Sequence, residues 1–216
     1  MDRLDEQREY YRLRAPEYDE WWRAQGRYAK SPAEQRRWLG DIAEVEAALE
    51  EFGPGGDVLE LAAGTGWWTQ RLARTARRVT AVDANEETLA LNRERTAPYG
   101  NVDYVIADLF AWTPPEAAFD VVFFGYWLSH VPEERLPAFQ RMVTSALRPG
   151  GRVFVVDSYR PERLPDDVQE RVLNDGRRFE VVKRYWQPAE LEAVPGWRLT
   201  ATVTAGRGIV YGRTAA

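Results

Sequence analysis

A glycine-rich turn is the first feature of this sequence that could bind a small molecule. Gly64-Thr65-Gly66 follows a short apolar segment at 58–61. Glycines at a strand-to-helix turn let a ligand approach the backbone, and the free amide groups of the helix start can bind it. The same turn carries Glu60 and Ala62 but no lysine, which fits a ligand without phosphate groups.

Two carboxylates end the next two apolar segments. Asp83 lies about 20 residues beyond the glycine turn, the spacing at which a carboxylate accepts hydrogen bonds from both hydroxyls of a ribose. Asp108 could accept a hydrogen bond from an adenine amino group, with Leu109 and Phe110 beside the ring. Because ligands of open parallel sheets bind at the carboxyl ends of the strands, these features together predict a site for adenosine.

Each of these signals also has a purely structural explanation. The glycines could serve the turn alone, Asp83 could cap the next helix, and Asp108 could cap the following turn. A nicotinamide-binding fingerprint would need a third glycine where Thr69 stands, so that alternative fits incompletely.

The segment after the fourth apolar stretch could carry the chemistry. It contains Tyr126, Trp127 and His130, the only histidine of the chain. A histidine has a pKa near 6.5, so His130 could remove a proton from an acceptor or orient it. The alternative is a histidine that only hydrogen-bonds within its turn. No nucleophile elbow of the G-x-S-x-G type surrounds Ser129.

A basic stretch at 159–185 is a candidate substrate lid. We expect the acceptor pocket between this stretch and Tyr126 and Trp127. Its cations include Arg177 and Lys183, and arginine pairs well with a carboxylate or phosphate group. The competing interpretation is a solvated, charged surface.

Composition limits the classes of function. The 216 residues contain no cysteine and one histidine, so thiolate and multi-histidine metal sites are excluded and we predict no metal. The net charge of −5 argues against nucleic acid as a partner. The start of the chain has no apolar signal core, and the longest apolar run, 121–128, is far shorter than the ~20 residues that cross a bilayer. We therefore expect a cytoplasmic protein without membrane contact.

The elements that would position these residues alternate between strand and helix. Strands are predicted at 58–61, 78–83, 102–108, 119–125 and 152–158, and helices at 66–76, 85–96 and 137–147. Apolar strands interleaved with helices indicate a parallel sheet covered on both faces, an α/β fold in one domain over 1–216.

The two ends of the chain differ from this core. Residues 1–50 are predicted to be helical, with Pro16 dividing the first part and a capping box from Ser31 to Glu34 starting a long helix that Gly53 ends. Toward the C-terminus, helices are expected near 165–174 and 188–194. Two antiparallel strands at 197–204 and 208–213 follow.

Five motifs in this order resemble the class I S-adenosylmethionine (SAM)-dependent methyltransferases. The resemblance is close over about 52–158 and loose over the C-terminal hairpin. The motifs are Val58-Leu59-Glu60-Leu61-Ala62-Ala63-Gly64-Thr65-Gly66, Val82-Asp83, Ala107-Asp108-Leu109, Phe119-Asp120-Val121-Val122 and Leu147-Arg148-Pro149-Gly150-Gly151. One departure is Ala62-Ala63, where the family often has Gly-Cys or Gly-Ser.

The resemblance implies a Rossmann-like seven-stranded sheet of order 3-2-1-4-5-7-6 with strand seven antiparallel and helices on both faces. It also implies SAM as cofactor and S-adenosylhomocysteine (SAH) as product. Glu60, Ala62, Gly64 and Gly66 would then surround the methionine portion, Asp83 the ribose, Asp108 and Leu109 the adenine, and Phe124 with Gly125 the sulfonium.

The segment from Tyr10 to Asp19 resembles a part of small-molecule methyltransferases that folds over bound SAM. Residues 1–50 would form such a cap, with Tyr11 and Tyr18 facing the cofactor. An aromatic ring near a sulfonium gains about 1 kcal/mol from cation–π attraction. Alternatively, these rings only pack the helix onto the sheet.

The leading hypothesis is an enzyme that methylates oxygen or nitrogen of a small organic acceptor. The alternatives are a protein or RNA methyltransferase, a nicotinamide-dependent oxidoreductase and a non-catalytic adenosine-binding regulator on the same fold. The sequence does not indicate an oligomeric state.

Overall fold

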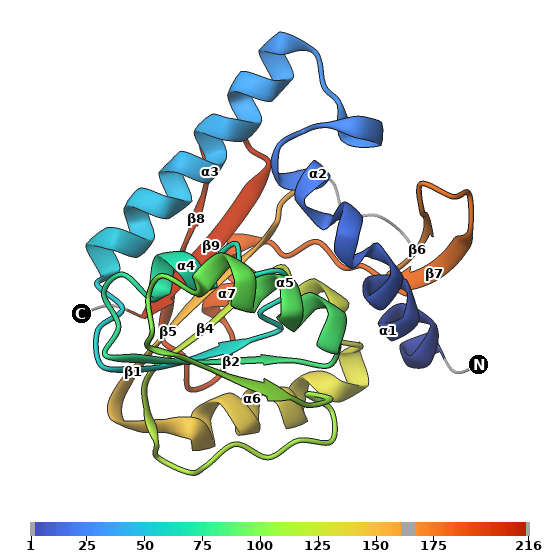
Figure 1. The fold of residues 1–216 in the computed structure, drawn as a ribbon. Coiled ribbons are helices and arrows are strands. Elements are labelled where there is room, and N and C mark those ends of the chain that lie inside the picture. The colour runs from blue at the N-terminus through green and yellow to red at the C-terminus, as the bar shows by residue number, and fades with distance from the viewer. Residues whose placement is uncertain (1–2, 161–166, 215–216) are drawn as a thin grey trace.

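Five parallel strands form the centre of the protein (Figure 1). The computed structural model describes residues 3–160 and 167–214. The parallel strands are β1 (Asp57–Leu61), β2 (Arg78–Asp83), β3 (Val102–Ile106), β4 (Phe119–Gly125) and β5 (Leu147–Ser158). They lie in the order β3-β2-β1-β4-β5, so the five predicted strands and their order are confirmed.

An antiparallel hairpin completes the sheet. Strand β9 (Ile209–Thr214) pairs antiparallel with β5, and β8 (Leu199–Val203) pairs with β9 at the edge. The full order β3-β2-β1-β4-β5-β9-β8 matches the predicted 3-2-1-4-5-7-6 because β8 and β9 are the sixth and seventh strands of this sheet. The fold is therefore Rossmann-like.

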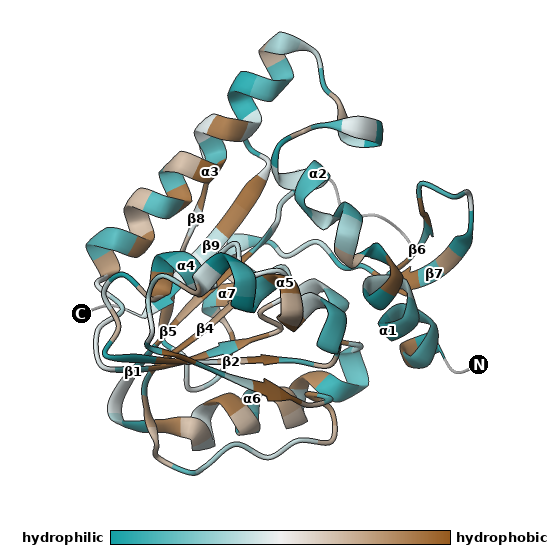
Figure 2. Ribbon diagram, viewed as in Figure 1, coloured by the Kyte–Doolittle hydropathy of each residue, from teal (hydrophilic) through white to brown (hydrophobic). Residues whose placement is uncertain are grey.

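Helices cover both faces of the sheet. In Figure 1, α3 (Pro32–Phe52), α4 (Thr69–Leu72) and α5 (Glu86–Thr96) lie on one side, and α6 (Leu136–Ala146) lies on the other, where α7 (Pro188–Glu192) also packs. Hydrophobic stretches lie along the central strands (Figure 2), and side chains on both faces of these strands are buried. For example, Phe123 packs on the α3 face and Phe124 on the α6 face.

The long helix α3 begins and ends as its sequence predicts. Ser31 Oγ accepts a hydrogen bond from the Glu34 amide, and the Glu34 carboxylate accepts one from the Ser31 amide, which completes the capping box. Gly53 ends the helix with φ +62°, a left-handed conformation that glycine adopts without strain. Because α3 packs on the sheet, it belongs to the core, and only the helices before it reach the carboxyl ends of the strands.

Two short helices precede α3. They are α1 (Arg3–Arg14) and α2 (Tyr18–Trp22), separated by the 3₁₀ turn η1 (Ala15–Glu17), as Pro16 predicted. A further 3₁₀ turn, η2 (Gly26–Tyr28), leads toward α3. Two more, η3 (Leu128–His130) and η4 (Glu133–Arg135), lie between β4 and α6.

The prediction of a helix near 165–174 is wrong for the residues of this range that the structure describes. Residues Val168–Val172 form β6, which pairs antiparallel with β7 (Arg178–Val182), and 165–166 lie outside the described residues. The reason is tertiary: β7 carries the buried Phe179 and Val181, which pack against Tyr10 of α1. In Figure 1 this hairpin projects beside α1, away from the main sheet.

The helix predicted at 66–76 is much shorter in the structure. Only Thr69–Leu72 is α-helical, and turns flank it on both sides. Backbone hydrogen bonds in this stretch alternate between three- and four-residue spacing, for example Arg71 to Trp68 and Ala73 to Thr69. A mixture of the two spacings keeps the chain coiled but prevents a regular helix.

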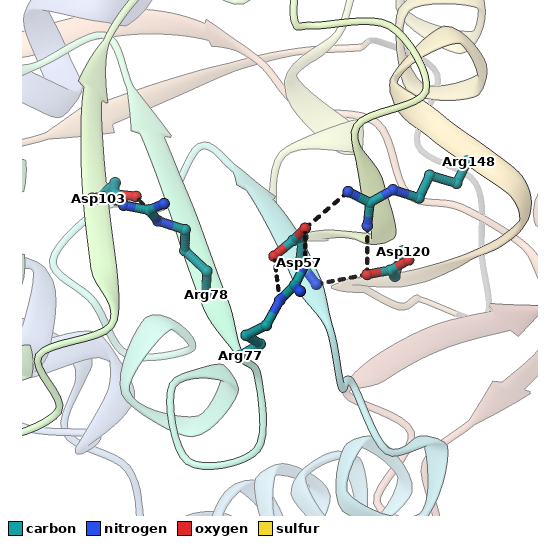
Figure 3. Close-up of polar contacts among 6 residues, drawn as sticks. All are labelled: Asp57, Arg77, Arg78, Asp103, Asp120 and Arg148. Atoms are coloured by element: carbon teal, nitrogen blue, oxygen red, sulfur yellow. Dashed lines mark hydrogen bonds and ion pairs between the residues drawn. The ribbon is translucent and has the colours of Figure 1, made fainter.

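A charged network ties the strands together at their amino ends, opposite the predicted site (Figure 3). Arg148 binds Asp57 at 2.9 Å and Asp120 at 2.7 Å, and Arg77 also pairs with Asp57. The Asp57 amide donates to the Asp120 carboxylate over 2.8 Å. Hydrogen bonds from these arginines hold the pKa values of Asp57 and Asp120 below their usual range.

Among the residues that the structure describes, no helix is long and apolar enough to cross a membrane.

Candidate functional site

A cavity opens at the carboxyl ends of β1 to β4, where the sequence placed the adenosine site. We call it the strand-end cavity. Helix α1 and Tyr18 of α2 form one wall, and the loops after the four strands form the other. The loop residues are Ala62, Gly64, Asp83, Ala84, Asn85, Asp108, Leu109, Phe110, Gly125, Tyr126, Trp127 and His130, with Thr88 from α5.

Asp83 is fixed at the floor of this cavity by three donors. One carboxylate oxygen accepts from the Gly64 amide at 2.9 Å, and the other accepts from the Asn85 amide at 2.9 Å and the Thr88 hydroxyl at 3.1 Å. Burial raises its pKa, and these donors counteract that rise. A carboxylate oriented in this way can still accept hydrogen bonds from the two hydroxyls of a ribose.

The glycine turn leaves its backbone open to the strand-end cavity. Gly64 has φ +52°, and a Cβ added to it would meet nothing within 4 Å. The preceding Ala62 also has positive φ, +53°, which costs a non-glycine residue energy and is common at binding sites. By contrast, a Cβ on Gly66 would lie 2.6 Å from Asn92 Oδ1, so Gly66 serves packing and lines no part of the cavity.

Asp108 lies at the opposite end of the strand-end cavity, beside Leu109 and Phe110. One of its oxygens accepts from the Phe110 amide at 2.9 Å, and the other pairs with Arg8 of α1 at 3.0 Å. A carboxylate next to two apolar side chains matches the predicted adenine position. The Arg8 ion pair, which the sequence did not suggest, connects α1 to this loop.

Glu60 lies beneath the turn and does not line the strand-end cavity. It is 2% exposed, and its Oε2 has no hydrogen-bond partner among the described residues. Burial raises the pKa of Glu60 to about 8, and the nearby Asp83 adds to the effect. The carboxyl group is therefore largely protonated at neutral pH.

A second cavity adjoins the first, and we call it the tyrosine cavity. It lies between the N-terminal helices and the β6–β7 hairpin. Four residues line both cavities: Tyr11, Tyr18, Tyr126 and His130. The other lining residues are Tyr10, Arg14, Trp21, Arg27, Tyr28, Ser158, Glu170, Arg171, Val172, Lys183 and Tyr185.

Tyr11 and His130 form a hydrogen-bonded pair in this shared wall. The Tyr11 hydroxyl lies 2.7 Å from His130 Nε2, and His130 Nδ1 lies 2.5 Å from the Val182 carbonyl oxygen. Because a carbonyl only accepts, Nδ1 carries the proton and Nε2 accepts from Tyr11. Burial, aided by Lys183, lowers the pKa of His130 well below its usual value.

The loop after β4 brings Tyr126 and Trp127 to the strand-end cavity, whereas Phe124 points elsewhere. Tyr126 has φ +58°, and its amide donates to the Val156 carbonyl at 2.7 Å. Phe124 is fully buried against Phe139 and Trp197, because alternate side chains of β4 point into the core. The loop after β4 therefore lines the cavity where the sulfonium was predicted, whereas the Phe124 side chain does not.

The two cations singled out in 159–185 have different surroundings. Lys183 is 5% exposed and lines the tyrosine cavity, where its ammonium group lies 2.7 Å from Ser129 Oγ and 3.2 Å from Asp157 Oδ1. Burial lowers the pKa of Lys183. Arg177 is exposed, pairs with Asp175 at 2.7 Å and lines neither cavity.

Several lining residues escaped the sequence analysis. Arg14 lines the tyrosine cavity, and Gln7 bridges the two cavity walls through hydrogen bonds with the His130 carbonyl and the Val182 amide. Arg171, one of the cations of the basic stretch 159–185, lines the tyrosine cavity as well. The helical spacing of Gln7 and Arg14 with Tyr11 was a weak signal, because the β6–β7 hairpin that packs against α1 was not predicted. No group of three or more potential metal ligands occurs within 3–160 and 167–214.

Comparisons with known proteins agree with this geometry. Residues 58–151 match the family model described as a methyltransferase domain. The ubiquinone/menaquinone biosynthesis C-methyltransferase UbiE of Enterobacter sp. (strain 638) is 30% identical over 184 residues, which cover 70% of this chain and 72% of the relative. The chain spans only 48% or 44% of several other UbiE enzymes.

Two solved structures are similar over nearly the whole chain. A DhpI-SAM-HEP complex is 36% identical, with a TM-score of 0.79, and covers 99% of this chain and 98% of that one. A DhpI-SAH complex is also 36% identical, with a TM-score of 0.76, and covers 98% of this chain and 95% of that one.

The cofactor of this protein follows from these findings. SAM lacks phosphate groups and carries a ribose and an adenine, which fit the open Gly64 turn, Asp83 and Asp108. The nicotinamide alternative and the non-catalytic alternative lose their support, because the similar structures hold SAM or SAH and the relatives are enzymes. The chain belongs to the class I SAM-dependent methyltransferases, and SAM is its cofactor.

Proposed function

We propose that this methyltransferase methylates an oxygen or nitrogen atom of a small anionic molecule held in the tyrosine cavity. The observation that carries this proposal is the wall shared by the two cavities. Tyr11, Tyr18, Tyr126 and His130 line both, so a methyl group on one side lies beside a ligand on the other. SAM supplies, when bound, an electrophilic methyl group with a good thioether leaving group.

Charge favours an anion in the tyrosine cavity. Its lining includes Arg14, Arg27, Arg171 and Lys183, whereas Glu170 is the one carboxylate among the described lining residues. Glu170 pairs with Arg178 at 2.5 Å, Arg27 with Glu17 and Lys183 with Asp157, which leaves Arg14 and Arg171 without a carboxylate partner among the described residues. Arginine and lysine bind carboxylate and phosphoryl oxygens through charge-assisted hydrogen bonds. The DhpI complex with SAM and a second ligand, HEP, supports a site of this two-ligand kind.

An ionised oxygen acceptor would suit the surroundings of His130. His130 is neutral at physiological pH, since burial lowers its pKa, and its Nε2 already accepts from Tyr11. Such a histidine is a weak base. A nucleophile that arrives ionised needs no proton removed, so alignment and the exclusion of water are what the chain must provide. We assign His130 as a positioning residue that orients Tyr11.

The domain roles are proposed on the same basis. Helices α1 and α2 act as the cap over the cofactor, because α1 supplies Leu4, Gln7, Arg8 and Tyr11 to the wall of the strand-end cavity. The described part of 159–185 acts as the substrate lid, because β6 and the residues after β7 line the tyrosine cavity.

The experiment is a screen with methyl-labelled SAM. Purified protein is incubated with small carboxylates, phosphorylated compounds, amines, neutral alcohols, protein and RNA. We expect label on a small anionic compound, with the methylated atom identified by NMR of the product. Transfer only to neutral compounds or macromolecules would contradict the proposal, and a product methylated at carbon would exclude O- or N-methylation.

A further inference from the structure

Arg14 occupies an unusual position at the end of α1. The residue is 7% exposed and lines the tyrosine cavity. Four tyrosine rings surround it: the guanidinium carbon lies 5.7 Å from the ring centroid of Tyr10, 5.9 Å from Tyr11, 4.6 Å from Tyr18 and 5.4 Å from Tyr28. Aromatic faces attract cations, so these rings stabilise the charge and fix its location.

The Arg14 charge has no counter-ion in the described parts of the chain. No carboxylate of residues 3–160 or 167–214 pairs with it, and its buried Nε has no hydrogen-bond partner there. Of the other cations in this cavity, Arg27 pairs with Glu17 at 3.1 Å and Lys183 with Asp157, and Arg171 is only partly buried. Buried charges are ordinarily paired, and a lone one next to a cavity indicates a ligand that completes it.

A second unpartnered group lies in the wall of the same cavity. The Tyr10 side chain is fully buried, and its hydroxyl has no hydrogen-bond partner among the described residues. Burial raises the pKa of Tyr10, so the phenol keeps its proton and remains a donor. Because buried donors are normally satisfied, a guanidinium and a phenol that both lack acceptors indicate a ligand with acceptor oxygens.

We infer that Arg14 binds the anionic group of the methyl acceptor, with the Tyr10 hydroxyl as a second donor. This inference rests on the proposed function and names the residue that selects the substrate. The planar guanidinium donates in parallel to two oxygens, a geometry that carboxylate and phosphoryl groups share. Because Arg14 stacks on Tyr18, which also lines the strand-end cavity, it fixes the distance between the anion and the methyl donor.

Anion binding to SAH-saturated protein tests this assignment. Sulfate, phosphate and acetate are titrated by calorimetry into the wild type, Arg14→Met, Tyr10→Phe and a control, Arg36→Met. Arg36 is exposed on α3 and lines neither cavity. We expect Arg14→Met to weaken the tightest anion at least about tenfold and Tyr10→Phe by less, with SAH affinity unchanged. The relative affinities of the tetrahedral anions and acetate identify the preferred group.

Unchanged anion affinity in Arg14→Met, with SAH still bound, would overturn the inference. If Arg14→Met does not fold, Tyr10→Phe decides, because it removes only one hydroxyl, and wild-type anion affinity in that variant counts against the site. If the labelling screen finds no anionic acceptor while Arg14 still governs sulfate binding, the proposed function fails and Arg14 remains an anion-binding residue of this cavity. Methylation of an anion with an unchanged KM in Arg14→Met would reject only this inference.

Discussion

The Tyr11 hydroxyl donates a hydrogen bond to His130 Nε2 over 2.7 Å, at the wall that separates the two cavities. This contact joins the first helix to the loop after β4, which are 119 residues apart in sequence. It also occupies the one nitrogen of His130 that could take a proton, because Nδ1 donates to the Val182 carbonyl. The pair therefore determines what His130 can do in catalysis.

The first prediction concerns the pH dependence of methyl transfer. Burial lowers the pKa of His130, so the imidazole gains its proton only at a pH well below the usual 6.5. The pH profile of kcat/KM should therefore show no limb near pH 6.5 that belongs to this residue. His130→Asn should lower kcat about tenfold through misplacement of Tyr11 and leave the shape of the profile unchanged. A wild-type limb near pH 6.5 that His130→Asn abolishes would instead identify His130 as the base.

The second prediction concerns Glu60 and stability. Its pKa is about 8 in the folded, cofactor-free protein and near 4.5 when unfolded, so between these values the folded state binds more protons and stability falls as pH rises. Glu60→Gln removes this dependence. As the pH rises from about 4.5 to 7, the free energy of unfolding of Glu60→Gln minus that of the wild type should therefore increase by up to roughly 3 kcal/mol. Urea unfolding across this range measures it, and a pH-independent difference would contradict the assignment.

The third prediction separates Lys183 from Arg177. Lys183 lines the tyrosine cavity, so Lys183→Met should raise the acceptor KM at least about tenfold while the Kd for SAH stays the same. Arg177 is exposed and pairs with Asp175, so Arg177→Met should leave both constants within about twofold of wild type. Steady-state kinetics with an identified acceptor test both variants, and a reversed order of effects would refute the placement of the pocket.

The fourth prediction concerns the charged network at the amino ends of the strands (Figure 3). Asp120→Ala removes the acceptor of the Asp57 amide and one partner of Arg148. Unfolding should become easier by about 1 kcal/mol, because the groups are partly exposed. SAH affinity should not change, since this network lies across the sheet from the strand-end cavity. A loss of SAH binding without a loss of stability would be inconsistent with this separation.

Much of the fold could be predicted because its signals are local. The apolar runs ending in Asp83 and Gly125 define buried parallel strands, and the capping box at Ser31 defines the start of α3. The strand-end cavity follows from these elements, since its residues directly follow the strands. The residues Ala62, Gly64, Asp83, Asp108 and Leu109 were found in this way.

The tyrosine cavity could not be predicted in the same way, because it depends on contacts between distant segments. Val168–Val172 forms a strand because it pairs with β7, which in turn packs against α1. No local sequence pattern indicates these contacts. The cluster of cations at 159–185 indicated Arg177, whereas the burial of Arg14 and its lack of a counter-ion among the described residues appear only in the folded chain.

The most direct test of the account is a calorimetric titration of SAH into the wild type, Asp83→Asn and the control Asp103→Asn. The Asp83 carboxylate is the predicted acceptor for the ribose hydroxyls, and its loss should weaken SAH binding by roughly 1.5–3 kcal/mol, or at least about tenfold in Kd. Asp103 pairs with Arg78 outside the cavity, so its variant should bind as the wild type does. Equal SAH affinity in all three proteins would contradict the central claim that the strand-end cavity holds the cofactor through Asp83.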